Sequence, residues 1–430
     1  MESIGFVEIL RTNPNCRYTW MGQVVSEVGD HFNNIAVLSL TLAHSGSGLA
    51  VAGIMIARAL PAIFAGPLAG VALDRFDRKR IMIASDLTRF VIALGFILCI
   101  DRTDNTLLYV LSAVLMFASP FFTAGRASIL PTITTKDELH TANSLTQTTS
   151  WAMTAVGAYL GGHSVNSFGF RAAFVFNAVS FLASALAISQ LKPVEGGSFR
   201  VLRDPDAPKR HPWQDYLDGL RYLRSVPLLL GIAMISVGWA TGGGAAQILF
   251  SLFGELVFKR GPGGIGDIWG SAALGLIVGG FFAHRIAKHL SYRQYKGMIS
   301  IAYVIHGAAY VIFSQMRNYA WALGFIGLSR MSVAVSSVMN SSQMLRHTAN
   351  EYRGRVMATT ETLSWATQML SMAGAGLAST TYSPRTIGAV AGILSGSTGI
   401  WWLWLNWAGK LPEPAVNEQE SDVEVHDPVN

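Results

Sequence analysis

Apolar runs long enough to cross a lipid bilayer recur along almost the whole chain. A membrane-spanning helix needs about 20 mostly apolar residues. The sequence offers twelve such runs, at 18–42, 48–73, 81–100, 106–125, 141–165, 170–190, 228–251, 266–285, 298–315, 319–341, 356–380 and 386–407. Hydrophobic residues make up 51% of the chain and charged residues 13%, whereas soluble domains carry about 25% charged residues. The sequence therefore predicts an all-α polytopic membrane protein with twelve transmembrane helices.

Basic side chains set the expected topology. Lys and Arg concentrate in every second loop, at 75–80, 126–136, 192–224, 285–296 and 346–355, and are sparse in the loops between them. By the positive-inside rule, these loops and both termini are expected in the cytoplasm. The net charge of +6 then reflects topology rather than nucleic-acid binding. Residues 1–17 contain no apolar core with a cleavage site, so no removable signal peptide is expected.

The longest polar segment separates six expected spans from six, and the two halves resemble each other. Ser150-Trp151-Ala152 in the fifth span recurs as Ser364-Trp365-Ala366 in the eleventh. We expect a cytoplasmic segment at 1–17, two pseudo-symmetric six-helix halves at 18–191 and 228–407, a cytoplasmic linker at 192–227, and a disordered cytoplasmic tail at 408–430.

Two segments have two interpretations each. Apolar residues recur in the linker at helical spacing and predict an amphipathic helix. This helix either lies on the cytoplasmic membrane surface or is an ordinary solvated linker helix. The apolar residues are Trp213, Tyr216, Leu217, Leu220 and Leu223. The run GWATGGGAAQ at 238–247 in the seventh span is either a flexing point or a site of close helix packing.

A polar stripe runs along the first span. If the span is helical, five polar side chains share one face: Gln23, Glu27, Asp30, His31 and Asn34. Such a stripe must face protein or water, because hydrocarbon cannot solvate it. Arg58 in the second span reaches a similar depth, so it is expected to pair with Asp30. The pair is either a proton switch, with Asp30 bound when charged and released when protonated, or a permanent structural bridge. Glu27 and His31 are either a proton relay or a neutral hydrogen-bonded pair.

Other charged residues lie inside expected spans. Asp86 and Arg89, three residues apart, are expected to form a structural pair. Arg330 lies near the middle of the tenth span, and Glu361 in the eleventh is either its partner or a second titrating group. An anionic group of a substrate is an equally good partner for Arg330.

The loop GVALDRFDRKR at 70–80 resembles the signature loop of the major facilitator superfamily. GQVVSEVGD, ARALPAIFAGPLAG, ASPFFTAGRASILPTI and EYRGRVMA are similar to segments of one branch, which contains enterobactin exporters and macrolide efflux pumps. Asp77 stands where the superfamily usually has glycine. The resemblance implies the major facilitator fold and transport by alternating access.

The same resemblance implies a conformational latch in this loop, formed by Gly70, Asp74, Arg75 and Arg78. The family pairs the acidic residue with the start of span 11 and the end of span 4, which implicates Arg126. A plain topological basic cluster with a tight turn is the alternative.

These features together predict a secondary active transporter, which exports a small siderophore-like or drug-like molecule in exchange for protons. Export follows from the resemblance. A lysophospholipid, metal or other solute transporter of the same fold, or a membrane scaffold or receptor, remains an alternative. An enzyme is not expected, because the chain contains no Walker A, HExxH or GxSxG motif. Cys16 and Cys99 suggest neither a disulfide framework nor a metal site. We expect no cofactor or metal, a monomer in the bacterial inner membrane, and a small molecule, protons and the lipid bilayer as partners.

Overall fold

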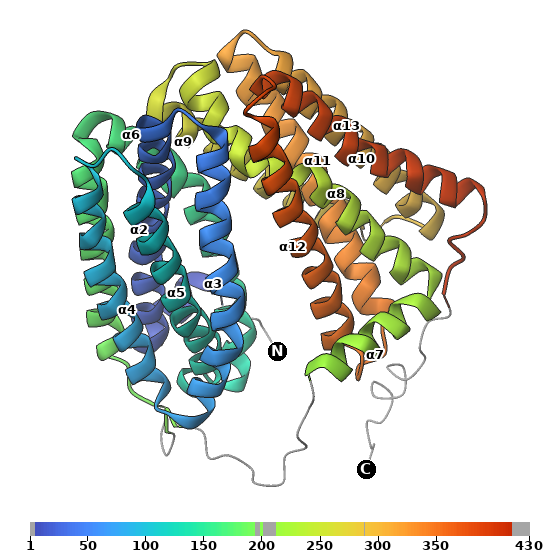
Figure 1. Ribbon diagram of the computed structural model, residues 1–430. Coiled ribbons are helices and arrows are strands. Elements are labelled where there is room, and N and C mark those ends of the chain that lie inside the picture. The colour runs from blue at the N-terminus through green and yellow to red at the C-terminus, as the bar shows by residue number, and fades with distance from the viewer. Residues whose placement is uncertain (1–4, 194–197, 201–211, 288, 415–430) are drawn as a thin grey trace, which may run out of the picture. The chain divides into compact units, whose positions relative to one another are not determined.

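The computed structural model describes residues 5–193, 198–200, 212–287 and 289–414. Helices joined by short turns account for nearly all of these residues (Figure 1). The helices are α1 (Phe6–Thr12), α2 (Pro14–Ser45), α3 (Gly48–Arg75), α4 (Arg78–Gly95), η1 (Phe96–Cys99), α5 (Thr106–Ile133), α6 (Lys136–Ser189), α7 (Pro212–Ser225), α8 (Pro227–Leu252), η2 (Phe253–Val257), α9 (Gly261–Ala287), α10 (Tyr292–Gln315), α11 (Tyr319–His347), α12 (Arg353–Ala378) and α13 (Pro384–Trp407).

The expected spans all coincide with long helices. Nine helical segments among the described residues are long and apolar enough to cross a membrane. One of them, α6, has 54 residues and contains the fifth and sixth expected spans. Gly169 separates these two spans, since its φ of 78° lies in the left-handed region that favours glycine. The helices α2 and α12 have 32 and 26 residues, but their polar side chains make them too polar to count among these nine segments.

Helix starts follow the local sequence. The Asn13 side chain accepts a hydrogen bond from the Cys16 amide at 3.1 Å, and Pro14 occupies the first helical position, so α2 begins there. Asp77 caps α4 in the same way, because its carboxylate accepts from the Arg80 amide at 2.9 Å. The residue that departs from the family glycine is therefore a helix cap.

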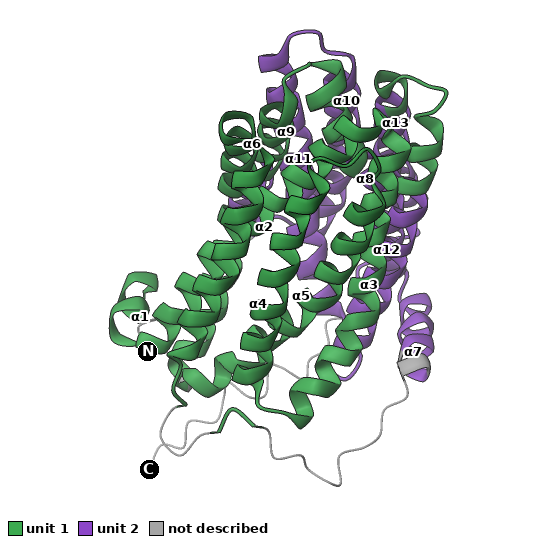
Figure 2. Ribbon diagram, turned by 60° about the vertical axis from the view of Figure 1, so that its left-hand side comes forward, with its two compact units in different colours: residues 1–207, 247–274, 372–387 green, residues 208–246, 275–371, 388–430 purple. Residues whose placement is uncertain are grey.

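The chain forms two compact units (Figure 2). Unit 1 contains residues 1–207, 247–274 and 372–387, and unit 2 contains 208–246, 275–371 and 388–430. Unit 1 thus includes parts of α8, α9, α12 and α13 as well as α1 to α6. One boundary within α8 lies between residues 246 and 247, just before the last residue of the glycine-rich run at 238–247. The six-helix halves at 18–191 and 228–407 are a different division and stay a prediction.

The linker helix α7 packs on another helix of unit 2. The Tyr222 hydroxyl accepts a hydrogen bond from the Ala349 amide at 3.0 Å, and Asp218 lies 4.0 Å from Arg355 at the start of α12. Neither sequence interpretation of this helix included that contact. Residues 201–211 of the linker, the Trp213 side chain and the tail from 415 onward lie outside the described residues.

Candidate functional site

Glu27 is the centre of a polar network inside unit 1. Its Oε1 accepts hydrogen bonds from Gln23 Nε2 at 3.0 Å, Arg126 Nη1 at 3.0 Å and Ser150 Oγ at 2.7 Å. The donors lie on α2, α5 and α6. Charge-assisted bonds of this kind are stronger than neutral ones, so the network ties three helices to one carboxylate. Arg126, the candidate latch residue, lies in this network, and Gln23 and Ser150 are additional members.

Asp30 faces a different arginine from the one expected. Its Oδ2 lies 4.0 Å from Arg89 Nη1, and the ion pairs of the described residues do not include a pair between Asp30 and Arg58. Arg58 is still within electrostatic range of Asp30. Its Nη1 is buried without a hydrogen-bond partner in the described part of the chain. The expected pair between Asp30 and Arg58 therefore stays a prediction. Arg89 is an additional cation beside Asp30, which depth in the membrane alone could not identify.

The expected pair between Asp86 and Arg89 is confirmed. Arg89 Nη2 is hydrogen-bonded to Asp86 Oδ1, and both side chains are buried, at 0% and 2% exposure. The Arg89 guanidinium also lies over two aromatic rings, with its carbon 4.6 Å from the centroid of Phe122 and 4.3 Å from that of Phe181. Neither phenylalanine could be found from the sequence, since aromatic residues in spans are common.

Small residues bring α2 and the second part of α6 close together. A Cβ on Gly29 would lie 2.8 Å from the Asn177 Oδ1 atom, and one on Gly22 would lie 3.3 Å from the Ser184 Oγ atom. His31, on another side of α2, packs against Gly157, where a Cβ would be 2.9 Å from its ring. Close packing of this kind fixes the direction in which the polar stripe points.

The remaining stripe residues are half-buried. Asn34 and His31 have intermediate exposure on α2. The hydrogen bonds of Glu27 within the described chain do not include His31. The proton relay between Glu27 and His31 therefore stays a prediction.

The candidate latch lies at the turn between α3 and α4. Asp74 and Arg75 are exposed. Arg78 Nη1 donates to the Ser128 carbonyl at 2.5 Å and thereby joins the start of α4 to α5. A Cβ on Gly70 would meet nothing within 4 Å. The latch role of these residues is not decided by this geometry and stays a prediction.

Unit 2 has a buried polar cluster of its own around Arg330. The Arg330 side chain is 8% exposed, and His306 and Tyr310 on α10 are each 2% exposed. His306 Nδ1 is held by Ser329 Oγ at 2.7 Å. The gap in this cluster is too narrow to hold a water molecule, and it is lined by Gly242, Gly243, Ala246, His306, Tyr310, Arg330 and Ser395. Glu361 is exposed on α12. His306 and Tyr310 were missed, because single polar residues in an apolar run carry no periodic signal.

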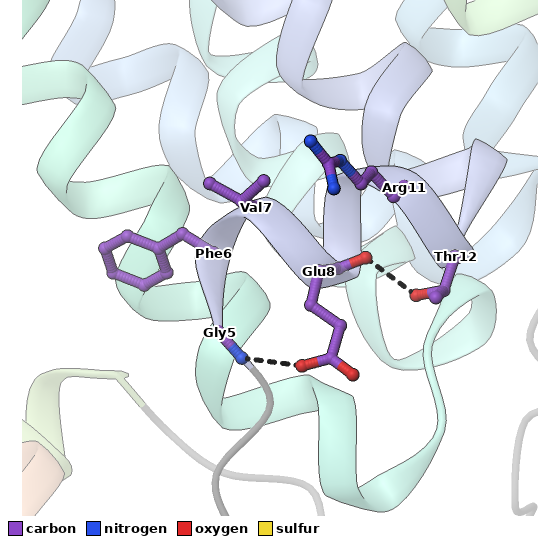
Figure 3. A pocket seen from close by; sticks show the side chains of 6 residues that line it. All are labelled: Gly5, Phe6, Val7, Glu8, Arg11 and Thr12. Atoms are coloured by element: carbon purple, nitrogen blue, oxygen red, sulfur yellow. Dashed lines mark hydrogen bonds between the residues drawn. The ribbon is translucent and has the colours of Figure 1, made fainter.

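A second hollow lies beside the N-terminal helix (Figure 3) and is lined by Gly5, Phe6, Val7, Glu8, Arg11 and Thr12. Glu8 accepts from the Gly5 amide at 3.4 Å, and Thr12 Oγ1 donates to the Glu8 carbonyl at 2.9 Å. All six residues belong to α1 or its cap, a helix of 7 residues, so these groups serve the helix itself. Among the described residues, no group of three His, Cys, Asp or Glu could hold a metal ion.

Known proteins resemble this chain over most of its length. The family profile described as Major Facilitator Superfamily matches residues 19–370. BacE of Bacillus amyloliquefaciens, assigned by name as a bacilysin exporter, is 24% identical over 353 residues, which cover 81% of this chain and 84% of BacE. The enterobactin exporter EntS of Escherichia coli O1:K1 is 25% identical over 359 residues, covering 81% of this chain and 82% of EntS.

Solved structures show the same fold. The nucleoside transporter NupG matches with a TM-score of 0.70 at 10% identity, over 90% of this chain and 99% of NupG. A bacterial homologue of the human lysosomal transporter Spinster matches with a TM-score of 0.64 at 13% identity, over 93% of this chain and 96% of the homologue. At such low identity these matches concern the arrangement of the helices alone.

Proposed function

Since this chain belongs to the Major Facilitator Superfamily, whose members are membrane transporters and not enzymes, we propose that it exports a small organic or amphipathic molecule in exchange for protons. The observation that carries the proposal is Asp30, a carboxylate on α2, the helix of the first expected span. Its side chain is 35% exposed and lies 4.0 Å from the buried Arg89.

Asp30 combines the two properties that a proton carrier needs. A third of its side chain is exposed, and we expect protons to reach it from that side. Because it faces a cation on another helix, its protonation changes the attraction between α2 and α4. A ligand shifts a conformational equilibrium by its different affinity for the two states, and a proton on Asp30 is such a ligand.

The direction of transport and the type of substrate come from the relatives. BacE and EntS are both named as exporters of small molecules. Export of a small siderophore-like or drug-like molecule fits these relatives. Alternating access by two six-helix halves would move it, with Asp74 as the latch residue.

The proposed setting is the cytoplasmic membrane of a bacterium, with both termini in the cytoplasm. The relatives come from bacteria, and the concentration of Lys and Arg in alternate loops supports this orientation. The proposed working unit is a monomer.

The test uses purified protein in liposomes that contain a trapped pH-sensitive dye. Hydrophobic and siderophore-like compounds are added in turn, and the wild type is compared with Asp30→Asn and with Asp101→Asn, an exposed control carboxylate between η1 and α5. We expect compound-dependent proton movement in the wild type and in Asp101→Asn, and none in Asp30→Asn. Compound flux without proton movement, unchanged by Asp30→Asn, would contradict the proposal.

A further inference from the structure

One guanidinium group serves two carboxylates in unit 1. Arg89 is hydrogen-bonded through Nη2 to Asp86 on its own helix, while its Nη1 lies 4.0 Å from Asp30 Oδ2 on α2. The two nitrogens of one planar group therefore face two acids on two helices. A guanidinium suits this arrangement, because its donors are fixed in a fork.

Two aromatic rings fix the position of that guanidinium. Phe122 of α5 and Phe181 of α6 lie 4.6 Å and 4.3 Å from its carbon and are 3% and 0% exposed. A cation over an aromatic face is attracted by the ring, more strongly where water is excluded. Arg89 is thus held between α5 and α6, and a change in its pairing moves the carboxylates rather than the arginine.

The two acids differ in access to protons. Asp86 is 0% exposed and directly bonded to Arg89, whereas the Asp30 side chain is 35% exposed and lies at the edge of ion-pair distance. We therefore expect a proton to reach Asp30 before Asp86. Asp86 stays paired with Arg89 and neutralises its charge. A buried arginine without a counter-charge would be energetically costly in a membrane protein.

We propose that Arg89 is the positioning residue of the proton-coupling site, with Asp86 as its permanent partner and Asp30 as its exchangeable one. Ionised Asp30 is drawn toward Arg89 and links α2 to α4. A proton from water binds a carboxylate oxygen of Asp30 and removes its charge, and Arg89 then pairs with Asp86 alone. The inference rests on the proposed proton coupling at Asp30 and adds the residues that convert protonation into a change of helix contact.

Other charged groups near Asp30 are accounted for. Arg58 reaches it from α3, Arg89 from α4, and Arg126 from α5, and Glu27 lies on the same helix. Glu27 and Arg126 are bonded to each other at 3.0 Å. Asp86 is a neighbouring acid, and its negative charge and that of Asp30 repel each other. Removing Asp86 therefore both frees Arg89 for Asp30 and removes a like charge.

The test is the pH dependence of compound-driven proton movement in liposomes. In Asp86→Asn, Asp30 becomes the only carboxylate on Arg89, so the pH of half-maximal proton movement should fall by about one unit or more. In Arg89→Gln, where the attraction is lost, this pH should rise by a similar amount. Arg89→Lys retains the positive charge but not the two fixed donor positions of the guanidinium, so the pH of half-maximal proton movement should rise less. This variant replaces the other two as the test if they do not fold. Asp101→Asn should leave the midpoint unchanged.

The outcomes separate the two proposals. Wild-type protein that moves no protons with any compound would overturn both the proton coupling and the role of Arg89. Proton movement that is lost in Asp30→Asn, with an unchanged midpoint in folded Asp86→Asn and Arg89→Lys, would overturn the role of Arg89 alone. A purely structural Asp86–Arg89 pair would lower the yield and the melting temperature of these variants without moving the midpoint.

Discussion

Tyr222 of the linker helix stacks on Tyr352 just before α12, with ring centroids 4.5 Å apart and planes at 16°. The stack fastens α7 to the start of α12. The backbones also approach closely, since a Cβ on Gly219 would lie 2.5 Å from Thr359 Oγ1 and 2.7 Å from the Arg355 carbonyl oxygen. The linker helix is therefore part of unit 2 rather than a free tether.

Gly219→Leu should push α7 away from α12. Forcing a side chain into a filled space costs about 1–3 kcal/mol, so the melting temperature of the purified protein should fall and transport should slow. Gly354→Leu is the matched control, because a Cβ there meets nothing within 4 Å. Equal melting temperatures for the two variants would show that α7 does not depend on this contact.

The pair between Glu27 and Arg126 should matter more for stability than a surface ion pair. The two side chains are 20% and 13% exposed and lie 3.0 Å apart. Removing one partner of a buried pair costs about 3–5 kcal/mol, and the partial exposure places Arg126→Gln at the lower end of that range. The double variant with Glu27→Gln should recover part of the loss in a denaturant or thermal series. A double variant less stable than both single ones would contradict the pairing.

Asp74→Asn tests the latch. If exposed Asp74 controls the change between conformations, the variant should reduce the maximal transport rate severalfold and leave the affinity for the compound nearly unchanged. Binding and transport rate, measured on the same preparation, check this. An equal loss of both would argue for a structural role, and Asp77→Asn, which keeps a helix cap at α4, is the control.

Close packing between α6 and α9 within unit 1 should tolerate no side chain. A Cβ on Gly266 would lie 2.6 Å from the Ala158 carbonyl oxygen, and His163 lies 3.7 Å from Asp267 beside this crossing. Gly266→Val should separate the helices and reduce transport and thermal stability. Gly280 lies on the same helix, and a Cβ there would meet nothing within 4 Å. Gly280→Val should therefore have a much smaller effect. A similar loss in both variants would indicate lower helix propensity alone.

Sequence patterns predicted the spans and the polar face of α2, because both depend on periodicity along one helix. They also predicted the Asp86–Arg89 pair, since residues three apart on a helix are neighbours. They failed where the answer depends on which helices pack together. Arg58 was the expected partner of Asp30, whereas Arg89 was expected beside Asp86. The packing of both α2 and α4 on α6 brings Arg89 to 4.0 Å from Asp30. The contact between Arg126 and Glu27 depends on tertiary packing in the same way.

The most direct test of proton coupling at Asp30 compares two assays on one preparation of Asp30→Asn. Counterflow exchanges labelled for unlabelled compound without a proton gradient, whereas accumulation against a concentration gradient requires an imposed pH difference. The account predicts that Asp30→Asn keeps counterflow near the wild-type rate and loses pH-driven accumulation. Accumulation that persists in Asp30→Asn at the wild-type level would contradict proton coupling through this residue.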